Sequence, residues 1–277
     1  MPGKVTRTAT RTAVKTAAAA ADVLRRPPAG LVVLIYHRVG RRTDTEVDLP
    51  RACFEDQIAW LAATLPVVSL DDGLAWVAGD DGARTREIRV AVTFDDGTAD
   101  FVDEALPVLE RFGVPATLYV ATAFVEEQRA FPNDGVPLSW AALRAALDTG
   151  VVTVGSHTHT HALLDRLPDD AVADELDRST GLIGDRLGVV ASHFAYPKAV
   201  MGSAAADRAV RARFVSGALA GGRANRPGRT DAFRLARTPV QVSDGEAWFR
   251  RKAGGGLALE ETLRSVANRR RYSNVTS

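Results

Sequence analysis

The stretch Ile88-Arg-Val-Ala-Val-Thr-Phe-Asp-Asp-Gly-Thr98 decides the fold of this chain. Its first seven residues are rich in β-branched side chains in alternation, which is typical of a β-strand. The strand stops at Asp95 and Asp96, and the glycine that follows permits a turn. Neighbouring side chains on extended backbone point opposite ways, so after such a turn one carboxylate can ligate a cation while the other stays free as a base. The competing interpretation is a plain turn in which Thr98 or Asp100 caps the next helix.

Apolar runs on both sides of this stretch predict further strands over residues 31–36, 67–70, 116–120, 151–155, 192–197, 214–219 and 233–242. Helical spacing predicts helices over residues 51–64, 99–112, 139–147, 169–187 and 204–211, and further terminal helices from Trp248 onward. Asp71-Asp72-Gly73 is interpreted as a helix start, and Pro107 should kink or split its helix. This alternation of strands and helices predicts one α/β domain of barrel type.

Composition limits the kind of protein. The chain has 277 residues, of which 46% are hydrophobic, enough for one large globular domain. Its net charge of +1 gives no reason to expect binding to nucleic acid. The single cysteine, Cys53, rules out an internal disulfide and a cysteine-based zinc cluster. A metal site in this chain must therefore use histidine and carboxylate ligands.

Residues 1–28 form a cationic, alanine-rich leader, which we expect to lie poorly packed outside the fold. Residues 29–277 then form a single catalytic domain. No apolar stretch approaches the ~20 residues of a membrane-spanning helix, and the run Ala17 to Ala21 is too short for a secretory signal. We therefore expect a cytoplasmic protein without peripheral membrane contact.

A second cluster of polar residues follows the predicted strand 151–155. His157, His159 and His161 are three of the five histidines in the chain. His157 and His161 are spaced i, i+4, so one helical turn would bring both rings to the same side, while His159 would point elsewhere. The competing interpretation is a polar turn with incidental histidines. His37 also follows an apolar strand, and taken alone it fits a hydrogen-bonded structural histidine better.

Asp96, His157 and His161 would together make a three-ligand site for a divalent metal ion, and zinc suits this set. A metal bound there lowers the pKa of its water and polarises a carbonyl oxygen. Asp95 would accept the proton of that water, and a group on the other side must donate one to the leaving atom. This chemistry is metal-assisted hydrolysis of an acyl bond.

The segments Thr93–Gly97 and His157–His161 resemble the first two motifs of the polysaccharide deacetylases of the NodB-homology group, carbohydrate esterase family four. The resemblance covers about residues 30 to 245. It implies a distorted (β/α)7 barrel of TIM-like type, with Asp96, His157 and His161 as metal ligands and Asp95 as the base. Members of the family typically remove acetyl groups from N-acetylhexosamine units.

Phe194–Lys198 resembles the third motif in its Phe-x-Tyr-Pro form, which occurs in exopolysaccharide deacetylases. The resemblance implies that a backbone amide near Tyr196 and Pro197 helps to hold the oxyanion. Ala199 stands where this form usually has glycine.

The late Leu-x-x-His motif that usually supplies the general acid is absent, because no histidine follows His193. Members with an early Tyr-His pair can use that histidine instead, so Tyr36-His37 makes His37 the best candidate acid. His193 is the competitor, but its position directly before Phe194 indicates that it is part of a strand.

We therefore expect a metal-dependent hydrolase that removes N-acetyl groups from an acetylamino sugar or polysaccharide. One alternative is a carbohydrate-binding pseudoenzyme, which the missing late histidine motivates. Another is a deacetylase that acts on an O-acetyl ester or a non-sugar amide. Aromatic residues make up only 6% of the chain, so a long stacked polymer groove is not indicated, which favours a small or soluble substrate.

Overall fold

The computed structural model describes residues 2–24, 28–79, 87–260 and 262–263. Within them, parallel strands close a barrel whose members are β1 (Gly30–Tyr36), β4 (Ile88–Phe94), β5 (Ala116–Val120), β6 (Val152–Ser156), β7 (His193–Ala195), β8 (Ser216–Ala220) and β9 (Leu235–Pro239). The barrel strands follow one another in chain order, and β9 pairs with β1 to complete the ring. The predicted seven-stranded α/β barrel is confirmed.

The strands pair over unequal lengths, which distorts the barrel. β1 and β4 are in register over their whole length, from Gly30 opposite Ile88 to Tyr36 opposite Phe94. In contrast, β6 and β7 share only the Ser156–Phe194 pair. The carboxyl-terminal ends of β1 and β4 therefore lie at the same level, which brings the residues after Tyr36 beside the residues after Phe94.

The side chains of β1 point alternately to the two faces of the strand, and both faces are buried. Leu31 and Val33 belong to the cluster inside the barrel, whereas Val32 and Leu34 belong to the cluster between the barrel and its helices. A strand buried on both faces needs apolar side chains at every position.

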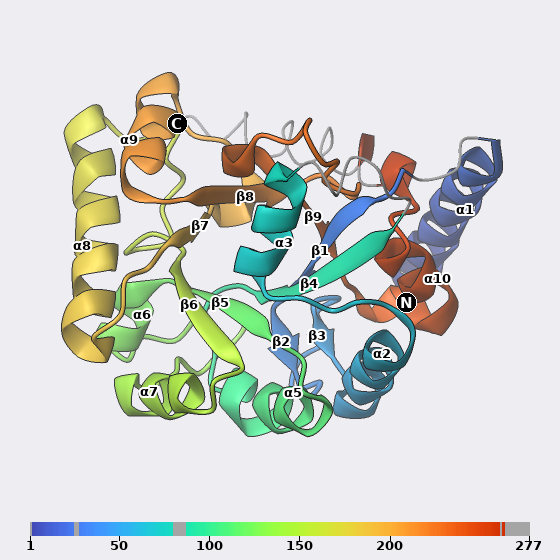
Figure 1. Ribbon diagram of the computed structural model, residues 1–277. Helices are drawn as coiled ribbons and strands as arrows, with labels where there is room; N and C mark the ends of the chain where they lie inside the picture. The colour runs from blue at the N-terminus through green and yellow to red at the C-terminus, as the bar shows by residue number, and fades with distance from the viewer. Residues whose placement is uncertain (1, 25–27, 80–86, 261, 264–277) are drawn as a thin grey trace.

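Helices surround the barrel (Figure 1), namely α2 (Arg51–Thr64), α5 (Leu106–Phe112), α6 (Thr122–Glu126), α7 (Trp140–Asp148), α8 (Asp169–Leu187), α9 (Ala204–Arg213) and α10 (Gly245–Ala253). Shorter elements are the paired strands β2 (Arg38–Val39) and β3 (Asp48–Leu49) and the 3₁₀ helices η2 (Pro197–Ala199), η3 (Ala232–Arg234) and η4 (Val242–Asp244). The helix predicted over residues 99–112 is split, as expected from Pro107. A π-helix, η1 (Phe101–Ala105), leads into α5, whose first turn contains the proline.

Helix α3 (Leu70–Ala78) lies across the amino-terminal end of the barrel, in front in Figure 1. Its position shows that the strand predicted at residues 67–70 is wrong. Val67 forms only an isolated bridge, and the Ser69 hydroxyl caps α3 by accepting from the Asp72 amide at 3.1 Å. The helix start predicted at Asp71-Asp72-Gly73 is correct to within one residue. A Cβ atom at Gly73 would lie 2.8 Å from Leu31, so glycine allows α3 to approach the barrel.

Helix α1 (Pro2–Leu24) contains the predicted leader, and its second half contacts the domain instead of lying outside the fold. Lys15 is 1% exposed, and its ammonium group lies 2.6 Å from the Asp244 carboxylate. Ala18 and Ala19 pack with Leu257. Small alanine side chains permit close approach, and the buried Lys15 has a charged partner, which the composition of the leader could not reveal. We correct the expectation of a poorly packed leader for this half of α1.

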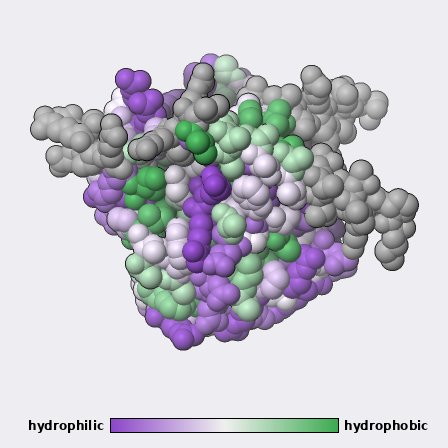
Figure 2. Space-filling view, turned by 90° about the vertical axis from the view of Figure 1, so that its right-hand side faces the viewer, coloured by the Kyte–Doolittle hydropathy of each residue, from purple (hydrophilic) through white to green (hydrophobic). Residues whose placement is uncertain are grey.

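The face of the molecule that carries α1 and α10 mixes hydrophilic residues with small apolar areas (Figure 2). Among the described residues, no helix is both long and apolar enough to cross a membrane.

Candidate metal-binding active site

The two carboxylates after β4 lie at the carboxyl-terminal end of the barrel. The amide of Asp95 donates to the last carbonyl of β1 at 3.0 Å, so Asp95 continues the β1–β4 ladder. Asp96 and Gly97 then adopt φ values of 77° and 98°, and the chain turns there. Aspartate tolerates this left-handed backbone better than most residues. The helix-cap interpretation is not supported for Asp100, because its side chain makes no capping bond and accepts from the Val39 amide at 2.7 Å.

The two histidines come from the loop that follows β6. The amide of His157 donates to the carbonyl of Val120, the last residue of β5, at 2.9 Å. Thr158 and His161 both have a φ of 64°, so residues 157–161 do not form the predicted helical turn. The loop nevertheless brings the rings of His157 and His161 together, with 4.9 Å between their centroids. The two imidazole rings are thus brought together by left-handed backbone at Thr158 and His161, and not by a helical turn. Sequence periodicity cannot predict such backbone.

Asp96, His157 and His161 meet at one point. The Asp96 carboxylate lies 3.5 Å from Nε2 of His161 and 3.8 Å from Nε2 of His157. One donor atom from each of the three residues lies within 4.8 Å of the other two. A zinc ion bound ~2.1 Å from each donor would hold tetrahedral donors roughly 3.4 Å apart. The three side chains therefore fit a single ion with little movement.

The protonation states of the imidazoles also suit a cation. Burial lowers the pKa of His157, and burial together with its neighbour His157 lowers the pKa of His161 to about 3. Both rings are therefore neutral at pH 7. Nδ1 of His157 lies 2.7 Å from the Ala195 carbonyl, which can only accept, so Nδ1 carries the proton and Nε2 keeps its lone pair toward Asp96.

Asp95 is held by an arginine that the sequence did not single out. Arg237, from β9, is 1% exposed and donates to both Asp95 carboxylate oxygens, at 2.6 and 2.8 Å. Burial by itself would raise the pKa of Asp95, but the Arg237 guanidinium beside it holds that pKa well below its usual range. Asp95 is thus ionised and fixed in orientation beside His157, whose Nε2 lies 4.0 Å away.

His37 follows β1 directly and is half-buried at the same end of the barrel. Within the described part of the chain its Nδ1 is buried without a hydrogen-bond partner. Burial of Asp96 would raise the pKa of its carboxyl, but the neighbouring imidazoles, His37 first and then His161, hold that pKa below its usual value. His37 therefore lies at the same end of the barrel as the three-residue cluster, where an acid is required.

His193, the competing acid, lies at the opposite end of the barrel as the first residue of β7. Its Nδ1 is 2.9 Å from the Ser216 hydroxyl, and its Nε2 is 3.1 Å from the carboxylate of Asp71 in α3. These contacts make it a buried structural histidine, far from the carboxyl-terminal ends of the strands.

Comparison with known proteins agrees with this geometry. Residues 82–215 match the family model of the polysaccharide deacetylases, a segment that contains Asp95, Asp96, His157 and His161. Over these residues the chain is similar to the polysaccharide deacetylases.

Solved structures of the family extend the match over most of the chain. IcaB from Ammonifex degensii is 27% identical, with a TM-score of 0.70, and the match covers 83% of this chain and 98% of IcaB. The Streptococcus pyogenes deacetylase PplD, solved in complex with acetate, is 17% identical with a TM-score of 0.66, covering 86% of this chain and 98% of PplD. YxkH of Bacillus subtilis (strain 168) is 23% identical over 177 residues, which are 61% of this chain and 57% of that protein. The match thus spans little more than half the length of this curated relative.

The oxyanion role expected of a backbone amide near Tyr196 and Pro197 stays a prediction. The amide of Tyr196 already donates to the carbonyl of Ala218 in β8 at 3.0 Å, and Pro197 has no N–H. The Tyr196 ring packs against Phe194 in a buried cluster. Ala199, where the motif usually has glycine, has a φ of 54°, so a position that favours glycine is occupied by alanine in the left-handed region.

Glu175 supports the histidine loop and was also missed from the sequence. From α8, its carboxylate accepts from the amides of His159 and Thr160 at 2.9 and 2.8 Å and from the Thr160 hydroxyl at 2.6 Å. His159 points away from the cluster, as predicted, and its Nδ1 lies 2.9 Å from the Thr122 hydroxyl. A single glutamate in an amphipathic helix gives no signal of this kind, whereas Arg237 could have been noticed as a charge within a predicted buried strand.

Proposed function

We propose that this protein is a metal-dependent hydrolase that removes N-acetyl groups from an acetylamino sugar or polysaccharide. The observation that carries the proposal is the convergence of Asp96, His157 and His161 beside a carboxylate, Asp95, that Arg237 holds ionised. The family match supports an acetylated polysaccharide as the class of substrate.

Asp96, His157 and His161 would hold the metal ion, for which zinc suits the mixed carboxylate and imidazole donors. A divalent ion bound there supplies Lewis acidity, which polarises the acetyl carbonyl and lowers the pKa of water toward ~7. The lowered pKa of the water matters for Asp95. A carboxylate whose own pKa is lowered is a weak base, and it accepts a proton readily only from a water molecule of lowered pKa.

The other residues act on protons and orientation. Asp95 accepts the proton of the attacking water, and Arg237 keeps both carboxylate oxygens in place while it does so. His37 donates a proton to the amide nitrogen as the carbon–nitrogen bond breaks, so the products are acetate and a free amino sugar. His37 suits this role because it follows β1 at the end of the barrel that carries the cluster, and its Nδ1 has no hydrogen-bond partner within the described chain.

The proposal is tested by measuring acetate released from N-acetylated oligosaccharides. We expect release to stop on chelation, to return on adding zinc, and to be lost in Asp95→Asn and His37→Ala. Metal content separates binding from chemistry: His161→Gln should lose zinc, whereas its matched control His159→Gln, from the same loop with its ring turned away, should retain it. Wild-type activity after full chelation, or in Asp95→Asn, would refute the mechanism.

Two outcomes of the same assay identify the alternatives. Binding of metal and sugar without acetate release in the wild type would identify a pseudoenzyme. Faster release from O-acetyl esters or non-sugar amides than from N-acetyl sugars would keep the reaction centre and change the leaving group.

A further inference from the structure

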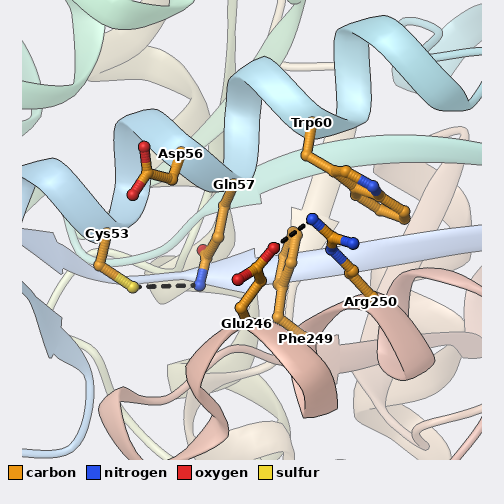
Figure 3. A pocket seen from close by; sticks show the side chains of 7 residues that line it. All are labelled: Cys53, Asp56, Gln57, Trp60, Glu246, Phe249 and Arg250. Carbon is orange, nitrogen blue, oxygen red and sulfur yellow. Dashed lines mark hydrogen bonds and ion pairs between the residues drawn. The ribbon is translucent and has the colours of Figure 1, made fainter.

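A cleft on the flank of the barrel lies apart from the metal-binding cluster. It has a volume of about 480 Å³, within the ~300–1,000 Å³ range of small-ligand sites. Helices α2 and α10 face each other across it (Figure 3). The side chains that carry the argument are Asp56, Gln57 and Trp60 of α2 and Glu246, Phe249 and Arg250 of α10.

One side of the cleft is aromatic. The rings of Trp60 and Phe249 meet edge to face with 6.0 Å between centroids, and the Arg250 guanidinium lies 5.3 Å from the Trp60 ring. Arg250 also pairs with Glu246, one turn earlier on α10. The side chains of Arg250 and Glu246 are 48% and 72% exposed, so this ion pair can rearrange around a ligand while Phe249 stays fixed in the core.

The opposite side carries a preoriented amide. Oε1 of the buried Gln57 accepts from the Tyr36 hydroxyl at 3.0 Å. This bond fixes the orientation of the side-chain amide, so that Nε2 points away from Tyr36. There Nε2 meets only the weak acceptor Sγ of Cys53, at 3.5 Å, among the described residues. Asp56, exposed on the same helix, adds a carboxylate. The cleft thus combines the partly exposed ring of Trp60 with hydrogen-bonding groups on two helices.

We propose that the α2–α10 cleft binds a pyranose ring of the glycan chain outside the active site. A sugar ring has apolar C–H faces for the Trp60 ring, which Phe249 supports from the core, and equatorial hydroxyls for Gln57, Asp56 and Glu246. A purely apolar ligand would leave these polar groups without partners, and an anion would meet two carboxylates for one arginine. The proposal rests on the proposed function, because it assigns a second contact to a polymeric substrate or product of that reaction.

A second contact should matter only for chains long enough to reach both sites. Retention in native gels containing soluble glycol chitin measures binding without turnover when every protein also carries Asp96→Asn. We expect Trp60→Ala to lose retention and Trp76→Ala to keep it. Trp76 is a matched control because an arginine, Arg89, also stacks on it, at 4.7 Å, and because it does not line the α2–α10 cleft. Asp56→Ala, at an exposed position, should weaken retention as well and keeps the test valid if Trp60→Ala unfolds.

In the catalytically intact chain, Trp60→Ala should raise KM for glycol chitin by about tenfold and leave kcat/KM for N-acetylglucosamine dimers unchanged. Wild-type protein that is not retained, or Trp60→Ala and Asp56→Ala proteins retained like wild type, would overturn the proposal. Retention that depends on Trp60 in a protein that releases no acetate would support the cleft while rejecting the proposed function, so the two failures are distinguishable.

Discussion

At the scale of single residues, the site depends on paired charges and on backbone that few side chains adopt. Asp96 and His161 both lie in the left-handed region, and each contributes a donor atom to the candidate metal site. Such backbone is unfavourable by ~1–2 kcal/mol per residue, so the surrounding structure must hold it. Asp95 and Glu175 show how this is done, since each is fixed by two or more hydrogen bonds from distant segments.

Removing the positive charge of Arg237 should weaken the site and shift its pH dependence. Arg237→Met leaves Asp95 buried without its partner, so the pKa of Asp95 should rise and activity should fall more at pH 5 than at pH 8. Loss of one partner of a buried pair destabilises by about 3–5 kcal/mol. A pH–rate profile and urea unfolding measure both effects, with Arg237→Lys as the charge-retaining control. An unshifted acidic limb in Arg237→Met would contradict the assignment.

Changing Glu175 should loosen the metal site without touching its ligands. Glu175→Gln removes the negative charge that accepts from the amides of His159 and Thr160, so these loop hydrogen bonds weaken. Supporting residues of this kind affect metal affinity by about 10–100-fold. Competition with a chelator measures the zinc affinity. Asp174→Asn, at the preceding residue, is the control, because its exposed carboxylate pairs only with Arg178 among the described residues.

At the scale of elements, the two ends of the barrel have different tasks. The carboxyl-terminal ends of β1, β4 and β6 lead into His37, Asp95 and His157, as expected for the catalytic face of an α/β barrel. The amino-terminal end is closed by α3, whose Asp71 reaches the buried His193. Titratable groups at that end therefore bear on stability and not on the reaction.

The contact between α3 and β7 should make stability depend on pH. Burial lowers the pKa of His193, whereas in the unfolded chain the value is about 6.5. The unfolded state therefore binds more protons below pH ~6.5, and this contribution to stability is lost as the pH falls, at no more than ~1.4 kcal/mol per pH unit. Urea unfolding at pH 7.5 and 5.5 should show a smaller difference for His193→Gln than for wild type. Equal differences would show that His193 titrates normally.

The packing of α1 on the domain depends on the ion pair between Lys15 and Asp244. Lys15→Met removes one of two lysines on the buried Asp244 carboxylate, while Lys252 remains at 2.8 Å. We expect a loss of about 1.5–3 kcal/mol in the free energy of unfolding, typical of a hydrogen bond to a charged group. Arg11→Met removes the partly exposed pair with Glu46 and should change stability by less than about 1 kcal/mol. Similar unfolding curves for the two variants would argue against a buried anchor.

At the scale of the whole molecule, the barrel brings together residues that follow β1, β4 and β6 with Arg237 of β9, although they are spread from position 37 to position 237 of the chain. A ligand that binds only this folded arrangement stabilises all of it by mass action. Metal binding should therefore be visible in global unfolding as well as in activity.

Zinc should raise the melting temperature of the intact protein. At a free concentration about 100 times its dissociation constant, the expected gain is ~2.7 kcal/mol, which corresponds to roughly 5–10 °C for a domain of this size. Thermal unfolding with zinc and with a chelator measures the shift. Asp96→Asn should show little or none, and an equal shift in both proteins would place the ion elsewhere.

The sequence by itself determined the barrel, because strands buried on both faces and amphipathic helices leave periodic signals that need no partner to be recognised. It also located Asp95, Asp96, His157 and His161, since each stands directly after or near the end of such a strand. Periodicity could not show that left-handed turns, rather than a helical turn, join the two imidazoles.

Only the tertiary structure decided which charges pair. Arg237 meets Asp95 because β9 closes the ring onto β1, whose other neighbour is β4. In the same way Lys15 meets Asp244, and Gln57 lines a cleft opposite α10. These contacts join segments far apart in the chain, and a local pattern carries no information about which distant surface will cover it.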